Sequence, residues 1–211
     1  MKRLLRADPD AIEGTDRIES VSDNIFAVAM TLLIVNIKVP QNHGFEDVAH
    51  VWPVVLPLWH HLRAFGLSFL IIGLYWMAHH RIFVFIKRSD AWLMLINLAF
   101  MGFTVLTPFF SGLLGQFDES RVALELYGAN IVCISLTLQL TWWYATRRHR
   151  LVDADLPRSV IRFHTMRNIL VPVVCSIGIA LSFINHEATL WLYLVLPLSF
   201  FWPFTRARPL P

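Results

Sequence analysis

The sequence predicts an all-α integral membrane protein with six transmembrane helices, and three observations carry this prediction. Of the 211 residues, 56% are hydrophobic and only 16% are charged, whereas about a quarter of the residues are charged in an average soluble domain. The mean hydropathy is +0.55. Several apolar runs also approach the roughly 20 residues that a helix needs to cross a bilayer.

The apolar runs define six predicted spans. They cover residues 23–39, 59–85, 91–114, 122–146, 167–184 and 188–204. Pro172 falls near the start of the fifth span, where a helix tolerates proline, and Pro197 falls inside the sixth, where it predicts a kink. No linker or internal repeat interrupts the series, so residues 1–211 are predicted to form one domain. A polar segment, 1–16, precedes the first span, and a basic loop, 147–166, separates the fourth from the fifth.

Positive charge is distributed unevenly between the two sides of the predicted bundle. Of the 18 Lys and Arg residues, Lys38, Arg63 and Arg121 fall on one side, and the other fifteen fall on the side shared by both termini. Loops rich in Lys and Arg stay in the cytoplasm, so both termini are predicted to be cytoplasmic. This topology accounts for the net charge of +3 and the pI near 9.1, without a nucleic-acid partner.

The first span carries an apolar stripe that has two interpretations. At about 100° per residue, one face of a helix collects medium-sized apolar side chains, an amide and one hydroxyl. These residues are Asn24, Val28, Thr31, Leu32 and Val35. Ordinary helix packing explains such a stripe as well as a hydrophobic pore constriction does.

Polar residues crowd the start of the same span. Arg17, Glu19, Ser22 and Asp23 lie within seven residues, at a membrane boundary where an unpaired charge is costly. A helix cap at Ser22 or Asp23 explains part of this cluster. The remaining charges need partners in neighbouring spans.

The second and third spans offer such partners. The stretch "YWMAHHR" places Trp76, His79 and His80 on one helix face, and Asn97 lies within the third span. Because intramembrane polar groups seek hydrogen bonds across helices, we expect a buried polar network that joins the first three spans near their cytoplasmic edge.

The stretch "RIESVSDNIFAVAMTLL" resembles the signature of the transmembrane protein 175 family, the lysosomal potassium channels and their bacterial homologues. That signature is an Arg, three intervening residues and then Phe-Ser-Asp. Arg17, Ser22 and Asp23 match it, and Val21 stands at the Phe position. The stretches "GLYWMAHHRIF" and "LTPFFSGLLGQF" and the six-span layout also resemble the bacterial branch, so the resemblance extends over essentially the whole chain.

The resemblance implies a potassium-selective channel in the bacterial cell membrane, assembled as a homotetramer with the first helix of each subunit lining the pore. It implies permeant K⁺ and no bound cofactor, and no TVGYG-like run occurs in the chain. By position, Val28, Leu32 and Val35 would form the constriction, with Thr31 as a hydroxyl ring beside it. Val28 stands where many relatives carry Ile or Leu. The residues implied to form the structural polar network are Arg17, Ser22, Asp23, Trp76, His79, His80 and Asn97.

Other functions stay open at this stage. A secondary transporter is the main alternative, although such proteins usually show internal repeats and an acidic residue at the membrane midplane. Asp23 and Glu125 instead lie near span ends. The histidine pairs His60–His61 and His79–His80 suggest a haem or metal enzyme. They are not spaced as the clustered ligands of such a site would be, so neither an enzyme nor a metal site is predicted. A membrane scaffold without transport activity is also compatible with the sequence.

Overall fold

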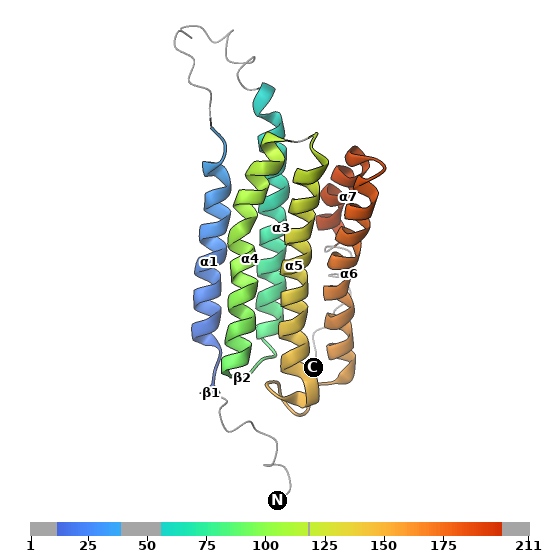
Figure 1. Cartoon of the computed structure of the whole chain (residues 1–211). Helices are drawn as coiled ribbons and strands as arrows, with labels where there is room; N and C mark the ends of the chain where they lie inside the picture. The colour runs from blue at the N-terminus through green and yellow to red at the C-terminus, as the bar shows by residue number, and fades with distance from the viewer. Residues whose placement is uncertain (1–11, 39–55, 118, 200–211) are drawn as a thin grey trace, which may run out of the picture.

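Five long apolar helices run alongside one another in the computed structural model, which describes residues 12–38, 56–117 and 119–199 (Figure 1). All five are long and apolar enough to cross a membrane, since 20 residues of helix span about 30 Å. This confirms the predicted helical membrane fold. The five helices are α1 (Asp16–Val35), α3 (Trp59–Phe83), α4 (Ala91–Gln116), α5 (Arg121–Thr146) and α6 (Arg158–Ser182).

The sixth predicted span is represented by α7 (His186–Ser199), which has 14 residues; residues 200–204 of that span lie outside the described part. α7 packs against α6 and contacts α3 and α5. Tyr193 is fully buried there and lies against Gly128 of α5 and Gly178 of α6. Because neither glycine carries a Cβ, the two positions form a notch that holds the tyrosine ring.

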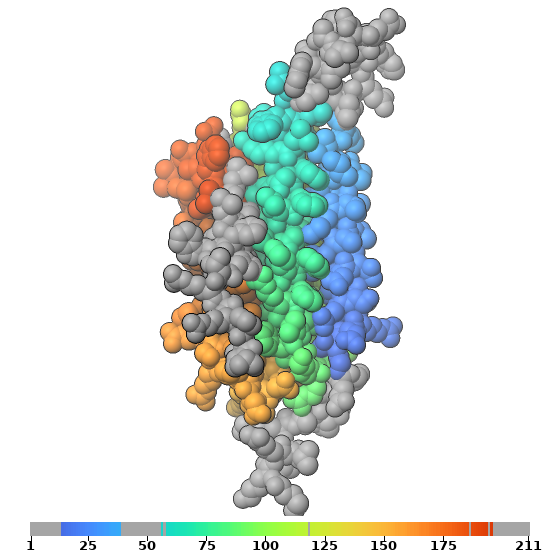
Figure 2. Space-filling model, turned by 180° about the vertical axis from the view of Figure 1, so that it is seen from behind, coloured from blue at the N-terminus to red at the C-terminus, as the bar shows by residue number. Residues whose placement is uncertain are grey.

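α1 lies at the edge of the bundle. Figure 1 shows it beside α4, and Figure 2, from behind, shows it along the flank of α3. It packs on α3 and α4 and is the least buried of the five spanning helices. Within the described part of the chain, no residues cover one long side of α1.

Two predicted boundaries are wrong. α1 begins at Asp16 rather than at residue 23, because charged residues fit an exposed first turn and acids favour a helix N-terminus. α6 begins at Arg158, directly after Pro157, so the predicted loop 147–166 is helical over its second half. Pro172 consequently lies in the interior of α6 and not in its first turn.

Short backbone pairings close the end of the bundle at which α1 starts. β1 (Ile12–Glu13) pairs with β2 (Arg88–Ser89) in antiparallel register, and Ile86 bridges to Val152. The 3-10 turn η3 (Arg147–His149) follows α5 at this end, and a second such turn, η2 (Leu56–Leu58), precedes α3.

Candidate functional site: the outer face and the polar anchors of α1

α1 divides into a buried stripe and an exposed stripe on opposite sides of the helix. The buried stripe consists of Ser22, Phe26, Ala29 and Leu33, spaced at i, i+4, i+7 and i+11 as helix packing requires. At about 100° per residue, the centre of the predicted stripe lies about 145° around the helix from this packing face. The structure leaves all five predicted stripe residues exposed: Asn24, Val28, Thr31, Leu32 and Val35.

The apolar members of this exposed stripe leave large fractions of their surface uncovered. Val28 is 50% exposed, Leu32 41% and Val35 67%. Packing among the described residues therefore does not explain the stripe, because their core lies on the other side of α1. Two explanations of the exposed stripe are left: it faces lipid, or it faces other copies of the chain.

Thr31 presents its side-chain oxygen on this exposed face. Its hydroxyl donates a hydrogen bond of 2.8 Å to the carbonyl oxygen of Val28, one turn earlier in the same helix. Because the proton is used within the helix, the lone pairs of the oxygen are available to a donor or a cation outside it.

A chain of hydrogen bonds joins α3, α4 and α1 inside the bundle. The side-chain amide of Asn97 donates to Ser22 Oγ at 3.0 Å, and Ser22 donates to the carbonyl oxygen of Ile18 at 2.8 Å. Asn97 Oδ1 lies 2.9 Å from His79 Nε2; since this oxygen accepts, the tautomer with the proton on Nε2 fits the contact. Ser22, His79 and Asn97 are all buried.

Aromatic rings enclose His79 in this chain. Its ring stacks on Phe83 at a centroid distance of 4.2 Å and on Phe100 at 5.3 Å, and Phe26 meets it edge-on at 5.9 Å. The enclosure fixes the ring plane, so His79 directs its Nε2 atom at Asn97. The bond joins α3 to α4, and the Phe26 ring adds α1 to the same cluster.

Asp23 and Trp76 form a second link, between α1 and α3. The indole N–H of Trp76 donates to Asp23 Oδ1 at 2.8 Å. His80 stacks on the Trp76 ring at a centroid distance of 6.5 Å with 23° between the planes. His80 therefore contacts the Asp23–Trp76 pair by ring stacking. With α1 starting at Asp16, Ser22 and Asp23 lie inside the helix and do not cap it.

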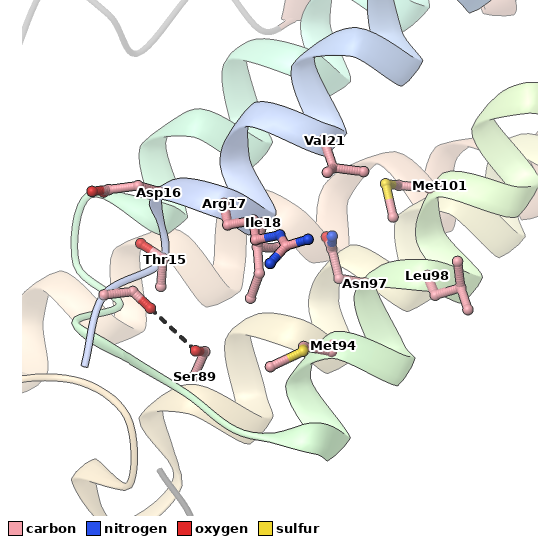
Figure 3. A pocket seen from close by; sticks show the side chains of 11 residues that line it. Thr15, Asp16, Arg17, Ile18, Val21, Ser89, Met94, Asn97, Leu98 and Met101 are labelled. Atoms are coloured by element: carbon pink, nitrogen blue, oxygen red, sulfur yellow. Dashed lines mark hydrogen bonds between the residues drawn. The ribbon is translucent and has the colours of Figure 1, made fainter. Parts of the chain in front are cut away.

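Arg17 lies apart from these contacts. It is five positions before Ser22, which places it about 140° around the helix from Ser22, on the same side of α1 as the exposed stripe. Figure 3 shows its guanidinium extending into a pocket between the start of α1 and α4, which Arg17 lines together with Val21 and Met101. The structure therefore does not bring Arg17 into hydrogen bonding with the other predicted members of the network.

Two further anchors were not predicted from the sequence. At the end of α1, the Asn36 amide donates to the carbonyl oxygen of Pro108 on α4 at 2.6 Å. Asp90 is buried before α4, accepts from Leu93 N at 2.8 Å, and also accepts from Tyr144 at 2.7 Å and Arg150 at 3.2 Å. An Asp directly before an apolar run is a typical helix cap signal, so the sequence alone could have identified Asp90 as the cap of α4.

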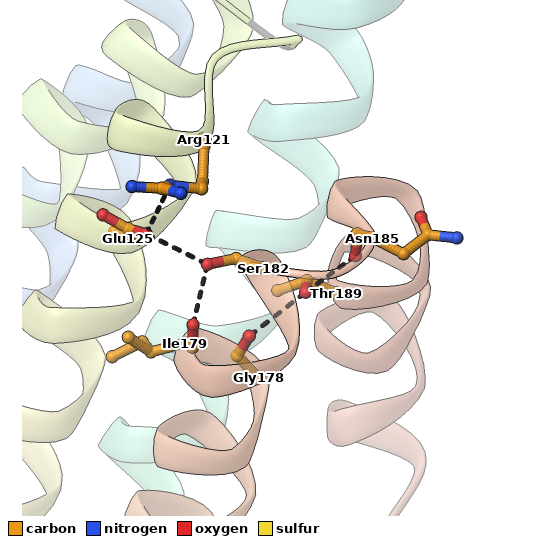
Figure 4. A network of polar contacts seen from close by, with 7 residues as sticks. All are labelled: Arg121, Glu125, Gly178, Ile179, Ser182, Asn185 and Thr189. Atoms are coloured by element: carbon orange, nitrogen blue, oxygen red, sulfur yellow. Dashed lines mark hydrogen bonds and ion pairs between the residues drawn. The ribbon is translucent and has the colours of Figure 1, made fainter.

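At the opposite end of the bundle, Glu125 links α5 to α6 (Figure 4). It pairs with Arg121 at 2.9 Å and accepts from Ser182 at 3.1 Å. The acid is thus held at a span end by partners on two helices. Elsewhere in the described residues, no three His, Cys, Asp or Glu side chains are grouped closely enough to hold a metal ion.

Comparisons with known proteins place the chain in a family. The family described as "Endosomal/lysosomal potassium channel TMEM175" matches residues 17–108. A potassium channel of Streptomyces collinus is 32% identical over 178 residues, which is 82% of this chain and 85% of that protein. A potassium channel of Chamaesiphon minutus is 32% identical over 189 residues, 88% of this chain and 93% of that protein.

A solved structure shares the architecture. The crystal structure of a lysosomal potassium-selective channel TMEM175 homolog from Chamaesiphon minutus matches with a TM-score of 0.78 and 29% sequence identity, over 89% of this chain and 96% of that chain. The resemblance seen in the signature around Arg17, Ser22 and Asp23 is confirmed over most of the sequence. The chain is an integral membrane protein that belongs to the TMEM175 family.

Proposed function

We propose that four copies of this chain assemble around a central pore lined by α1, and that the assembly is a potassium-selective channel of the bacterial cell membrane. The exposed stripe of α1 carries the proposal, because a fourfold arrangement would gather Val28, Leu32 and Val35 into apolar rings. Potassium is proposed as the permeant ion because the Streptomyces and Chamaesiphon relatives are named potassium channels. No cofactor is required for this function.

The chemistry of the stripe favours a pore over a lipid contact. Exposed positions on the other helices carry large side chains suited to lipid, among them Trp92, Phe109 and Trp143. The α1 stripe instead contains Asn24 and Thr31 among medium-sized aliphatic residues, and both are exposed. The Thr31 hydroxyl is paired within the helix, but the Asn24 amide is exposed. Because an exposed amide in hydrocarbon is costly, this stripe suits a narrow path that water and ions can enter.

The rings would act as a hydrophobic constriction. Apolar rings narrow a pore until water leaves it, and they control conduction without a charged plug. The Thr31 oxygens, whose protons are donated to Val28 carbonyl groups, would replace part of the hydration shell of a passing cation. This favours the ion that loses its water more easily, which is K⁺ rather than Na⁺.

The polar contacts around Ser22, Asp23, Trp76, His79 and Asn97 are proposed to hold α1 in place rather than to bind the ion. Each of these groups has its partner within the subunit, and Ser22 lies on the packing side of α1. In the proposed topology the closed end with β1, β2 and η3 is cytoplasmic, because the basic residues of 87–88 and 147–150 gather there.

Flux measurements on the purified full chain in liposomes test the proposal. We expect K⁺ flux to exceed Na⁺ flux several-fold, and Val28→Asn and Leu32→Asn each to raise the leak and bring the two fluxes closer together. Ile34→Asn is the matched control, because Ile34 is 52% exposed on the same helix but lies about 100° from the stripe centre. Size-exclusion chromatography must show the same assembly for all three variants.

Several results would contradict the proposal. Unchanged flux in both stripe variants would remove Val28 and Leu32 from the constriction, and an equal effect of Ile34→Asn would show that the stripe is not special. Saturable transport without unitary currents in a planar bilayer would favour the secondary transporter. A stable assembly without fourfold symmetry would remove the proposed rings.

A further inference from the structure

The outer side of the contact between α5 and α6 lies away from the proposed pore. Figure 1 shows α1 at one edge of the bundle and α6 toward the other, with α4 and α5 between them. α1 packs on α3 and α4, whereas α6 packs on α5 and α7. With α1 at the centre of the proposed assembly, this outer side faces the surrounding membrane.

Trp142 fixes the level at which α5 and α6 meet. Its indole N–H is shared between the carbonyl oxygen of Ile161, at 3.3 Å, and the hydroxyl oxygen of Thr165, at 3.2 Å. Trp143 follows Trp142 and therefore lies about 100° further around α5. Arg162 follows Ile161 and lies at the same angle further around α6. Because the two helices run in opposite directions, both turns lead to the same side of the contact, where Trp143 and Arg162 are exposed.

Arginines gather around this level. The guanidinium carbon of Arg147 lies 4.9 Å from the centre of the Trp143 ring, in a cation–π contact. Arg158 precedes Arg162 by one helical turn, so the two share a side of α6. Both are exposed, and neither forms a hydrogen bond or an ion pair with another residue that the structure describes. Together, Trp143, Arg147, Arg158 and Arg162 form what we call the basic α5–α6 face.

The side of α6 that carries these arginines becomes apolar directly after Arg162. Met166 and Ile169 follow at helical spacing, and both are exposed. On α5, Leu140 is exposed three positions before Trp143. Tryptophan is typical of the layer in which headgroups meet hydrocarbon. The basic α5–α6 face therefore lies at a membrane boundary, with positive charge above and apolar surface below.

We infer that the basic α5–α6 face binds an anionic phospholipid, with its phosphate between Arg158 and Arg162 and its acyl chains along the apolar side of α6. Guanidinium groups offer paired donors that suit phosphate oxygens, and the positive end of the α6 helix dipole lies at the same level. A soluble phosphate would leave the apolar surface unused. A zwitterionic headgroup would bring its own cation toward three arginines. The inference does not depend on which ion the protein conducts.

Photocrosslinking to the purified full chain in an uncharged detergent tests the inference. The probe is phosphatidylglycerol with a diazirine on one acyl chain, and its crosslinks are mapped by mass spectrometry. We expect crosslinks on peptides that contain residues 136–143 or 162–173. Unlabelled phosphatidylglycerol should compete. Phosphatidylcholine with the same acyl chains and glycerol phosphate without chains should each compete at least tenfold more weakly, because each has only part of the required chemistry.

One pair of substitutions tests the charge. Arg158→Gln combined with Arg162→Gln should weaken the binding of phosphatidylglycerol at least tenfold, because the phosphate loses both of its proposed donors. Lys87→Gln combined with Arg148→Gln is the matched control, since it removes two exposed basic groups from the same end of the bundle but outside the basic α5–α6 face. The control should bind within twofold of the unmodified protein.

A second substitution tests the indole. Trp143→Leu should weaken the binding at least threefold, because Arg147 loses the ring that holds it beside the phosphate. Trp92→Leu is the control, since Trp92 is an exposed tryptophan on α4, and it should stay within twofold. Size-exclusion chromatography of every variant must show the same assembly as the unmodified chain.

Four outcomes would overturn the inference. Binding that is unchanged in both the Arg158 and Arg162 pair and Trp143→Leu would place the lipid elsewhere. An equal loss in the Lys87 and Arg148 pair would indicate a general effect of charge. Crosslinks spread evenly over all lipid-facing helices, or equal competition by phosphatidylcholine, would indicate an unspecific lipid layer. Equal competition by glycerol phosphate would indicate a soluble phosphate ligand.

Discussion

The side-chain amide of Asn97 on α4 donates a hydrogen bond of 3.0 Å to the hydroxyl oxygen of Ser22 on α1, and both side chains are buried. Near the other end of α1, Asn36 donates to the carbonyl oxygen of Pro108 on the same helix α4. Between these bonds lie the packing residues Phe26, Ala29 and Leu33. α1 is thus joined to α4 by a polar bond near each end and by apolar contact between them.

The Ser22–Asn97 bond predicts a measurable coupling energy. Interhelical hydrogen bonds in membranes contribute about 0.6 kcal/mol on average and up to about 1.7. We expect Ser22→Ala and Asn97→Leu to be non-additive by an amount in this range in a double-mutant cycle on unfolding in mixed micelles. Strictly additive effects would show that the two side chains do not interact.

The bond between Trp76 and Asp23 predicts an effect on assembly. Trp76→Phe removes the indole N–H but keeps an aromatic ring beside His80, and Asp23→Ala removes the acceptor. Both should lower the fraction of protein that elutes as the full assembly, by severalfold, because α1 loses a contact with α3. Asp23→Asn keeps the accepting oxygen and should behave nearly like the unmodified chain. A stable assembly of Asp23→Ala with altered ion preference would contradict the anchoring role.

The notch that holds Tyr193 predicts a rescue that depends on one atom. A Cβ at position 128 would overlap the Tyr193 hydroxyl, whereas a Cβ at position 178 would lie 2.5 Å from the ring carbon Cε1. Gly128→Ala and Gly178→Ala should both loosen α7, seen as faster hydrogen exchange in residues 186–199. Adding Tyr193→Phe should restore Gly128→Ala but not Gly178→Ala, because it removes only the hydroxyl. Gly102→Ala is the control, since its Cβ would meet nothing within 4 Å.

The exposed hydroxyl of Thr31 predicts a change in selectivity without loss of the pore. Thr31→Val keeps the shape of the side chain and removes the oxygen. We expect the ratio of K⁺ to Na⁺ flux to fall at least twofold while the total flux persists, and Thr31→Ser to retain the ratio. If Thr31→Val left the ratio unchanged, the hydroxyl would have no part in ion preference.

Much of the site could be predicted because polar groups are conspicuous in apolar spans. Asn97 and Trp76 were paired correctly with α1, since an intramembrane amide or indole needs a partner and few were within reach. Helical periodicity alone places Val28, Leu32 and Val35 on one face of α1, but it does not distinguish a packed face from an exposed one. Periodicity also does not reveal what covers that face, which in the proposed channel is formed by other copies of the chain.

The errors also have physical causes. Proximity in the sequence predicts that Arg17 and Ser22 lie together, but their angle around α1 separates them. Asn36 and Pro108 are 72 positions apart, and Asp90 and Arg150 are 60 positions apart, so only the packing of α1 on α4 and of the loop after α5 brings them together. Hydropathy predicts a start of α6 that is too late, because it does not detect the polar turns of a helix that continues beyond the hydrocarbon.

The β1–β2 pair has a mechanical consequence for the helices that follow it. β1 leads into α1 and β2 leads into α4, and the strands are locked by the pairs Ile12 with Ser89 and Glu13 with Arg88. Tension on the chain before Ile12 is therefore shared by two helices and does not pull on α1 alone. Twisting α1 about its own axis would have to peel this ribbon apart and also break the bonds of Ser22 and Asn36. In the proposed channel, widening the pore by rotating α1 alone would therefore break these contacts, whereas tilting each chain as a whole would keep them.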